Sequence, residues 1–225
     1  MLNFPKTTEF NKKIPKQKFY GKLKVSNALE QQFVKEIETI IWKNKLSVET
    51  LNISAGTIVK EIEIIEINLK EQNISKNIIE IIDREIPYHI VFILRFKGLA
   101  QIYISFKEDS KNRKNKFKVN SYFKTEWLDY EELSLEIIGL TLDKIYENFI
   151  IQVADDRLQV ENGKDIKEAV LEAKEKERLE SLVVSLENKI KNEKQYNFQV
   201  KLAGKLKKVK KQLGATDNRQ KANHG

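Results

Sequence analysis

Apolar residues at helical spacing predict three helices in the first two thirds of the chain. These helices occupy residues 27–45, 75–86 and 140–156. Asn27 and Glu30 stand three residues apart, as in a capping box, and the apolar stripe that follows predicts a helix end near residues 43–45. Ser75 is the predicted N-cap of the second helix. The third helix carries one continuous apolar stripe, which favours packing against a sheet.

Other segments show the two-residue alternation, or the uninterrupted apolar run, that is typical of β-strands. They are 61–70, 87–96, 99–107, 118–128 and the shorter 133–138. In the first segment the apolar phase changes sides at Ile64 and Ile65, which predicts a β-bulge because one extra residue flips every later side chain. The order strand, helix, strand over 61–96 predicts a right-handed crossover between parallel strands, with 99–107 as an antiparallel neighbour. The predicted fold class is α/β or α+β, with a mixed sheet of about four to five strands and packed helices.

The chain divides into four predicted segments. Residues 1–25 contain Pro5 and Pro15 and no clear period, so we expect an extended arm that docks on the core. Its predicted anchors are Phe4, Phe10, Ile14 and Phe19. The other segments are an α/β core domain at 26–158, a coiled-coil-like helical tail at 159–213 and a disordered C-terminus at 214–225.

Two apolar seams in the tail follow the spacing of a coiled coil. The first seam is Leu179, Val183, Leu186 and Ile190, and the second is Leu202, Leu206, Val209 and Leu213. The step from Ile190 to Leu202 breaks the heptad phase, so either a long helix carries a stutter or the chain turns back near 192–197. Because neither proline nor glycine marks a turn there, we favour one long or slightly bent helix.

The composition restricts the chemistry available to this chain. It contains no cysteine, which excludes disulfides and cysteine-based metal sites, and its two histidines, His89 and His224, are too few for a histidine-rich metal site. His89 alternates with Val91 and Ile93 on a predicted buried strand, so we interpret it as a core histidine. Neither a GxGxxG nor a Walker-type loop occurs, and no cofactor is expected. No signal peptide or membrane span is predicted, and we expect a cytoplasmic protein.

Positive charge is concentrated in the tail. Of the formal net charge of +8, most comes from residues 159–225, which hold 16 Lys and Arg against 10 Asp and Glu. Such a basic segment favours an acidic partner.

Basic residues and aromatic residues occur together in the arm, in a loop near residue 114 and in the tail. Lysine dominates over arginine, which fits attraction to a phosphate backbone better than reading of bases. The alternative interpretation is that these lysines only solvate the surface. The predicted nucleic-acid contacts are Lys12, Lys13, Lys16, Lys18, Lys111, Arg113, Lys114, Lys116, Lys194, Lys201, Lys205, Lys207, Lys208 and Lys211.

A catalytic site is not predicted by any clear motif. A metal-dependent nuclease places acids and a Glu-x-Lys pair on adjoining strands, so that carboxylates hold the metal. Glu63, Glu66 and Lys70 are the candidates in this chain, but Glu66 and Lys70 are four residues apart instead of two. Glu66 and Lys70 share one face of the predicted strand, but a solvated strand edge explains this more simply than a catalytic site does, and we expect a protein that is not an enzyme.

Five segments together resemble a known family. They are TTEFNKKIPKQKFY at 7–20, WKNKLSVETLNI at 42–53, REIPYHIVFIL at 84–94, YFKTEWL at 122–128 and EKQYNFQVKLAGKLKKVKKQL at 193–213. They are similar to a bacterial and archaeal family of domains of unknown function, encoded beside helicases and DNA methyltransferases in restriction-like or antiphage defence loci. The resemblance implies an accessory protein whose partner, a helicase or methyltransferase, supplies the nucleotide-binding motifs missing here.

Three functions remain open at this point. The leading hypothesis is a non-catalytic accessory subunit of a DNA-directed defence system, which docks on a helicase or methyltransferase and contacts DNA through basic surfaces. The first alternative is a divergent metal-dependent nuclease. The second is a structural module that forms oligomers through its C-terminal helix.

Overall fold

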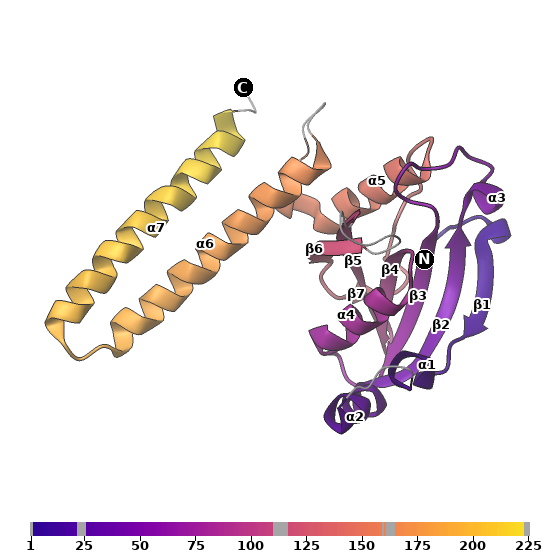
Figure 1. The fold of residues 1–225 in the computed structure, drawn as a ribbon, viewed down its shortest axis with the longest axis horizontal. Coiled ribbons are helices and arrows are strands. Elements are labelled where there is room, and N and C mark those ends of the chain that lie inside the picture. Colours follow the sequence, from indigo (N-terminus) through magenta and orange to yellow (C-terminus); the bar gives the residue numbers. More distant parts are fainter. Residues whose placement is uncertain (1, 22–25, 110–116, 159, 161–164, 223–225) are drawn as a thin grey trace. The chain divides into compact units, whose positions relative to one another are not determined.

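The chain forms two compact units in the computed structural model, residues 1–155 and 156–225. The structure describes residues 2–21, 26–109, 117–158, 160 and 165–222 (Figure 1). Within these residues no helix is both long enough and apolar enough to cross a membrane.

A seven-stranded mixed sheet forms the centre of the first unit. Its strands run in the spatial order β1 (Glu9–Lys13), β2 (Ile37–Leu46), β3 (Ile62–Leu69), β4 (His89–Phe96), β5 (Leu99–Asp109) and β6 (Phe117–Lys124), and β7 (Leu128–Asp129) pairs with β5. The β3–β4 pair is parallel, as predicted, and the other pairs are antiparallel. The fold is α+β, and the sheet is larger than the four to five strands expected. The segment 133–138 forms no strand.

Strand β2 corrects the first helix prediction. Helix α2 (Asn27–Glu36) begins at the predicted position, but its N-cap is Ser26 and not Asn27, with the hydroxyl of Ser26 accepting from the backbone N–H of Leu29. The helix ends well before residues 43–45. The segment that follows is rich in β-branched residues and includes Trp42, which favour the half-buried surface of a sheet over a helix. Its pairing with β3 on one side and β1 on the other decides its conformation.

The prediction of a bulge in 61–70 is wrong, because the bulge lies in the neighbouring strand β2. The register between these strands shifts between Trp42 and Asn44, opposite Ile65 and Ile64, so the extra residue belongs to β2. Strand β3 pairs with β4 without interruption. Both faces of β3 are buried, which explains why isoleucines occur on both of them.

The N-terminal arm docks on the core as predicted, but it also contains regular structure. It consists of a 3-10 helix η1 (Lys6–Thr8), the edge strand β1 and the short helix α1 (Gln17–Tyr20). Ring contacts fix it to the core. Phe4 contacts Phe149, Phe10 contacts Trp42, and both Phe19 and Tyr20 contact Phe33.

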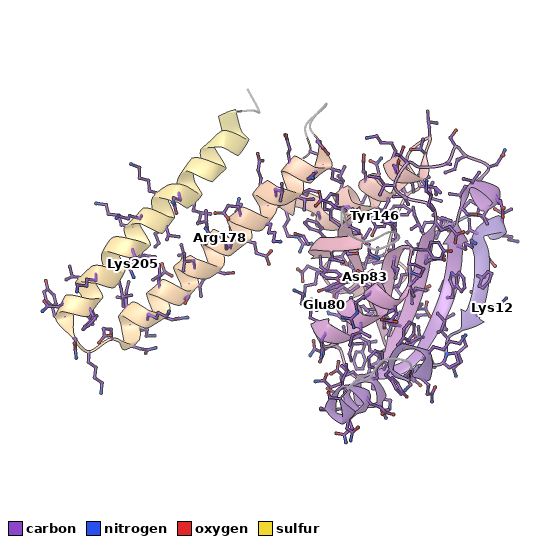
Figure 2. All side chains as sticks on the ribbon, in the orientation of Figure 1. Lys12, Glu80, Asp83, Tyr146, Arg178 and Lys205 are labelled. Atoms are coloured by element: carbon purple, nitrogen blue, oxygen red, sulfur yellow. The ribbon has the colours of Figure 1, made fainter. Side chains whose placement is uncertain are left out.

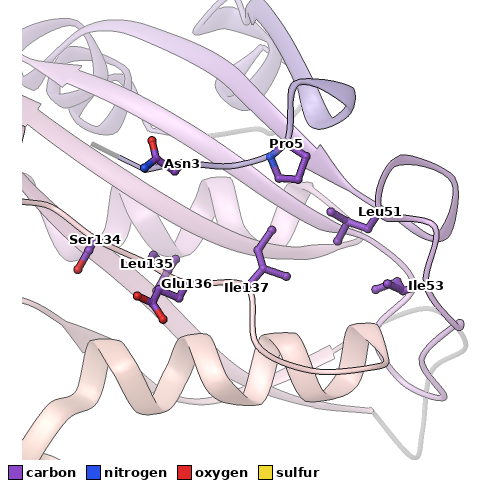
Figure 3. Close-up of a pocket in the computed structure, with 8 residues that line it drawn as sticks. All are labelled: Asn3, Pro5, Leu51, Ile53, Ser134, Leu135, Glu136 and Ile137. Carbon is purple, nitrogen blue, oxygen red and sulfur yellow. The ribbon is translucent and has the colours of Figure 1, made fainter.

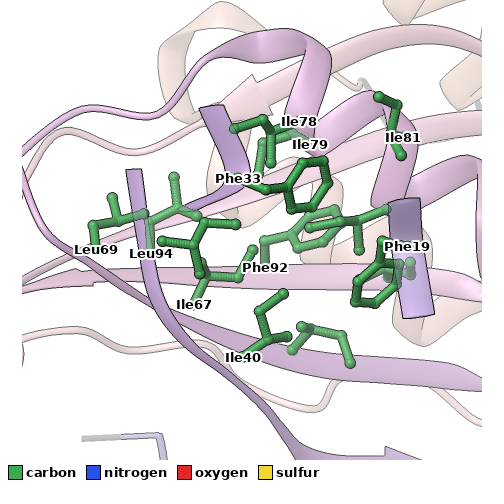
Figure 4. Packing of buried hydrophobic residues seen from close by; sticks show 14 of the residues in the cluster. Phe19, Phe33, Ile40, Ile67, Leu69, Ile78, Ile79, Ile81, Phe92 and Leu94 are labelled. Carbon is green, nitrogen blue, oxygen red and sulfur yellow. The ribbon is translucent and has the colours of Figure 1, made fainter. Parts of the chain in front are cut away.

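Helices cover both faces of the sheet. On one face α1, α2 and α4 (Lys76–Glu85) enclose the main apolar cluster, which includes Phe33, Ile67, Ile79 and Phe92 (Figure 4). On the other face α5 (Leu142–Ala154) packs on β5 and β6. Alternate residues of β4 point to opposite faces of the sheet. Phe92 packs in the apolar cluster beside α4, and His89 contacts Tyr146 of α5. The remaining short helices are α3 (Val48–Leu51) and η2 (Asp155–Arg157).

The second unit is an antiparallel helical hairpin, which shows that the preference for one long helix was wrong. Helices α6 (Ile166–Asn192) and α7 (Tyr196–Ala222) reverse direction at residues 193–195 (Figure 1). The two seams face each other, and Leu179, Leu186 and Val209 form the centre of their contact. Helix α7 continues to Ala222, where the sequence predicts disorder from residue 214 onward.

Candidate nucleic-acid interface

The turn of the hairpin is built around Glu193. Its backbone N–H donates to the carbonyl of Lys189 at 3.0 Å and so closes α6. Its carboxylate accepts from the N–H of Gln195 at 3.0 Å, and its carbonyl accepts from Nε2 of Gln199 at 2.6 Å. The last two bonds use side chains to satisfy backbone N–H and C=O groups that are left free at the ends of the two helices. The chain therefore reverses direction here without proline or glycine. The carboxylate of Glu193 is therefore engaged in the turn.

The lysines of α7 cover its solvent-exposed sides. One of them, Lys210, forms an ion pair with Glu187 across the hairpin at 2.7 Å. The predicted contacts in this segment are exposed, and none forms an ion pair with a residue whose side chain the structure describes. They are Lys194, Lys201, Lys205, Lys207, Lys208 and Lys211. Figure 2 shows Lys205 standing on this helix.

Because these lysines have no acidic partner among the described side chains, they form a positively charged surface on α7. In the first unit, by contrast, several lysines have carboxylate partners, as Lys45 has in Glu61 at 3.0 Å and Lys144 has in Glu147 at 2.6 Å. Unpaired lysines on one element attract polyanions and remain mobile enough to contact phosphates. The hairpin thus carries the candidate site.

The arm lysines divide into two groups. Lys12, Lys13 and Lys18 are exposed, and Nζ of Lys12 lies 4.2 Å from the ring centroid of Phe10 (Figure 2). Lys16 is half-buried and donates to the carbonyl of Ile37 at 2.9 Å.

Lys16 and Lys70 both bind carbonyls at the end of α2. Nζ of Lys70 donates to the carbonyl of Val34 at 2.8 Å, next to the contact of Lys16 with Ile37. Cations at a helix C-terminus satisfy its free carbonyls and its dipole. Burial lowers the pKa of Lys16, and the charges of Lys70 and Lys13 lower it further. The structure therefore gives Lys16 a capping role. The loop candidates Lys111, Arg113, Lys114 and Lys116 lie outside the described residues.

The nuclease candidates do not form one site. Glu63 and Glu66 are three residues apart in an uninterrupted strand, so their side chains point to opposite faces of the sheet. Both are buried, which corrects the expectation of a solvated strand edge. Oε2 of Glu66 lies 3.7 Å from Nη1 of Arg95, and the candidate Lys70 caps α2. Within the described residues no group of three or more His, Asp or Glu side chains is placed to hold a metal ion.

Glu63 sits in a low-dielectric environment that disfavours its charge. Burial raises the pKa of this carboxyl to about 8, and the neighbouring Glu61 adds to the rise, while Trp42 and Lys45 oppose it. His89 experiences the corresponding effect for a base. Burial lowers its pKa to about 3, with Lys107 adding to the decrease, and its ring packs edge-on against Tyr146. The prediction of a core histidine is confirmed by its burial.

A buried ion pair, which the sequence pattern did not predict, joins α4 to β5. Nζ of Lys107 lies 2.7 Å from Oδ1 of Asp83 and donates to the carbonyl of Tyr88 at 2.8 Å. The hydroxyl of Tyr122 donates to Oδ2 of Asp83 at 3.0 Å. Burial lowers the pKa of Lys107, and Asp83 opposes this decrease. The sequence contained one indication that Asp83 is buried, because this residue shares the apolar stripe of its helix with Ile79.

A pocket of about 500 Å³ opens on the first unit. It lies between the N-terminal segment, the residues that follow β2, and the extended segment before α5. Its lining is Asn3, Pro5, Leu51, Ile53, Ser134, Leu135, Glu136 and Ile137 (Figure 3). Figure 3 shows Ile137 and Leu51 pointing into the space below Pro5. The pocket is mainly apolar and contains none of the predicted contact residues.

Comparison with known proteins identifies a family for this chain. A family model described as domain of unknown function DUF4391 matches residues 2–213. No curated protein and no solved structure matches the chain. The family match includes the arm, the sheet, α6 and the greater part of α7. The chain therefore belongs to the DUF4391 family of domains of unknown function.

Proposed function

We propose that this protein is a non-catalytic accessory protein that binds nucleic acid through the α6–α7 hairpin. The observation that carries the proposal is the set of exposed α7 lysines that have no acidic partner among the described side chains. Phosphate contacts need mobile cations, and each contact releases condensed counterions from the nucleic acid. The seam leucines already pack against α6 of the same chain, so the lysines are what α7 presents outward.

The proposed setting is a DNA-directed defence system of the restriction or antiphage type. There the protein docks on a helicase or DNA methyltransferase, which provides the nucleotide chemistry for which this chain has no loop motif. Support for this setting comes from the sequence resemblance alone. Support for the binding role comes from the charge distribution on the hairpin.

The intramolecular hairpin disfavours the oligomerisation hypothesis. Leu202, Leu206 and Leu213 of α7 contact the seam of α6, as the two helices of a coiled coil do. A second chain would have to displace α6 to reach this seam. The buried and separated positions of Glu63 and Glu66 disfavour the nuclease hypothesis in the same way.

The test of the binding role is a titration of labelled duplex and single-stranded DNA at several salt concentrations. Replacing Lys201, Lys205 and Lys208 together with glutamine should weaken binding and reduce the salt slope by about 0.9 for each duplex phosphate that the variant no longer neutralises. The matched control replaces Lys12, Lys13 and Lys18 with glutamine, which removes the same charge from the arm. A larger effect of the hairpin variant supports the proposal. Equal effects, or no binding by the wild type to either DNA, would overturn it.

The partner is tested by purifying the tagged full-length protein from its native host under mild conditions. Mass spectrometry should identify a helicase or a DNA methyltransferase in stoichiometric amount. Recovery after nuclease treatment is required, because two DNA-binding proteins can co-purify on shared DNA. Purification of the protein alone from cells that express both enzymes would contradict the proposed setting.

A further inference from the structure

Two aromatic side chains next to the hairpin turn are exposed. Tyr196 is 76 % exposed and Phe198 is 51 % exposed at the start of α7. The leucines of α7, by contrast, have a place in the seam, where Leu202 and Leu206 pack on α6. Three aliphatic side chains of the hairpin are also exposed, namely Leu171, Val184 and Val200, but Tyr196 and Phe198 are the aromatic residues among its exposed side chains. Exposed aromatic residues beside unpaired lysines therefore suit a ligand that has both flat apolar surfaces and negative charge.

Each aromatic residue begins a row that contains lysines. Phe198, Lys201, Lys205 and Lys208 follow the i, i+3, i+7, i+10 spacing of one helix face. At a rise of about 1.5 Å per residue this row is roughly 15 Å long, which is enough for several consecutive phosphates of one strand. Nζ of Lys201 lies 5.4 Å from the ring centroid of Phe198, so cation and ring form one contact surface.

The second row begins with Tyr196. Val200, Lys207 and Lys211 follow it with the i, i+4, i+11, i+15 spacing of another face. Gly204 lies between the two rows, and a side chain at this position would meet no atom within 4 Å. Packing of the hairpin therefore does not require this glycine, although glycine is unfavourable in a helix interior. Its small size lets another molecule approach the helix backbone closely.

We propose that this aromatic end of the hairpin binds unpaired bases, so that the ligand of the hairpin is single-stranded nucleic acid. This inference rests on the proposed function and narrows its ligand. Single-strand binding combines lysines that follow the phosphates with aromatic rings on which bases stack. In a duplex the base faces are already stacked on each other, and only phosphates and groove edges remain accessible. A duplex would use the lysines and leave Tyr196 and Phe198 without a function.

The geometry of α7 distinguishes this ligand from a membrane surface. A helix that lies on a membrane presents one continuous apolar face with charges on the opposite side. The apolar face of α7 is occupied by α6. Tyr196 and Phe198 are two residues apart and so point to different sides of the helix, with lysines beside each.

The test uses the full-length protein and fluorescence anisotropy with three probes of equal length. These are single-stranded oligo-dT, a DNA duplex, and an abasic single strand that keeps the phosphates but lacks the bases. The wild type should bind oligo-dT about tenfold or more tightly than the other two. The variant with Tyr196→Ala and Phe198→Ala should lose this preference, with about a tenfold or greater loss on oligo-dT and no change on the duplex.

Two further variants test whether the aromatic rings cause the preference for oligo-dT. Phe198→Trp should restore tight binding of oligo-dT when introduced with Tyr196→Ala, because a larger ring stacks at least as well. Val184→Ala on α6, which also shortens an exposed apolar side chain, should change nothing. The glutamine variant of Lys201, Lys205 and Lys208 should weaken binding of all three probes.

Each remaining outcome refutes a specific statement. Equal affinity for oligo-dT and the abasic strand, or indifference of oligo-dT binding to the aromatic substitutions, would overturn base stacking but leave the proposed function intact. Absence of binding to every probe would refute the proposed function itself. Binding of polyglutamate that depends on Tyr196 and Phe198 and is stronger than binding of oligo-dT would assign this end of the hairpin to an acidic protein and overturn the inference.

Discussion

Lys107 and Asp83 form an ion pair inside the first unit, with 2.7 Å between Nζ and Oδ1 and both side chains almost completely buried. Removing one partner of such a pair leaves an uncompensated charge in the core. We therefore expect Lys107→Met or Asp83→Asn to lower the free energy of unfolding by about 3–5 kcal/mol. Urea denaturation of the two single variants and of the double variant measures the interaction free energy between Lys107 and Asp83.

The exposed pair of Lys76 and Glu80 is the matched control for this prediction. These side chains lie 3.6 Å apart on the surface of α4, and Lys76→Gln should change stability by at most about 1 kcal/mol. A similarly small effect of Lys107→Met would mean that the buried pair is solvated.

Glu63 should make the protein less stable as the pH rises. Its folded pKa of about 8 lies above the ordinary value of 4.5, so the unfolded chain releases this proton at lower pH than the folded protein does. The stabilisation is complete below pH 4.5 and is lost as the pH rises toward about 8, with a slope of up to about 1.4 kcal/mol per pH unit. Glu63→Gln should remove this slope in denaturation curves measured between pH 5 and 8. Glu80→Gln on the surface should leave it unchanged.

His89 should have the opposite pH dependence. Its folded pKa of about 3 lies below the ordinary value of 6.5, so the unfolded chain binds a proton that the folded protein does not. Its contribution to stability is present above pH 6.5 and is lost as the pH falls toward 3. His89→Phe, which keeps an edge-on ring beside Tyr146, should flatten this part of the curve. An imidazole NMR signal of His89 that titrates near pH 6.5 in the folded protein would contradict the prediction.

Asp143 fixes the loop before β3. Its carboxylate accepts from the backbone N–H groups of Thr57, Ile58 and Val59 at 2.6, 3.1 and 2.7 Å. Asp143→Ala leaves these donors without their acceptor and should cost about 1–3 kcal/mol. Hydrogen exchange should show faster exchange of the Thr57 and Val59 amides, while those of β4 stay protected. Gly56→Ala should have a similar effect, because a Cβ there would lie 2.5 Å from Oδ1 of Asp143.

The hairpin can be tested by measuring the distance between one residue of α6 and one residue of α7. Because the chain contains no cysteine, spin labels can be placed at Glu187→Cys and Lys210→Cys alone. These residues form an ion pair across the hairpin, whereas a single straight helix would separate them by about 35 Å. Electron paramagnetic resonance should therefore give a much shorter distance. A pair on α6 alone, Arg178→Cys with Glu187→Cys, calibrates the spacing within one helix, and a distance near 35 Å between the first two labels would refute the hairpin.

Elements whose hydrophobic pattern lies within their own residues were predicted correctly from the sequence. Helix α4 shows its apolar stripe within its own residues, and β4 shows the continuous apolar run of a strand buried on both faces. Their order along the chain also predicts that β3 and β4 are parallel. The lysines of the candidate interface belong to this class, because a charge surplus in one segment can be read without knowledge of the fold.

Elements that depend on a distant partner were missed. The residues of β2 fit a helical stripe as well as a strand, and pairing with β3 and β1 decides between the two. Asp83 and Lys107 are distant along the sequence, and only the packing of α4 on the sheet brings them together. The positions of Glu63 and Glu66 on opposite faces likewise follow from β3 being an inner, regular strand.

The sequence by itself determined the apolar seams and the surplus of lysine beside Tyr196 and Phe198, since spacing and composition are local properties. It left open whether α6 and α7 form one helix, because the break in heptad phase fits a stutter and a turn equally well. Tertiary structure decided this through the hydrogen bonds of Glu193 and the burial of both seams against each other. The same reversal leaves the lysines and the two aromatic rings exposed, because the apolar face of α7 is already covered.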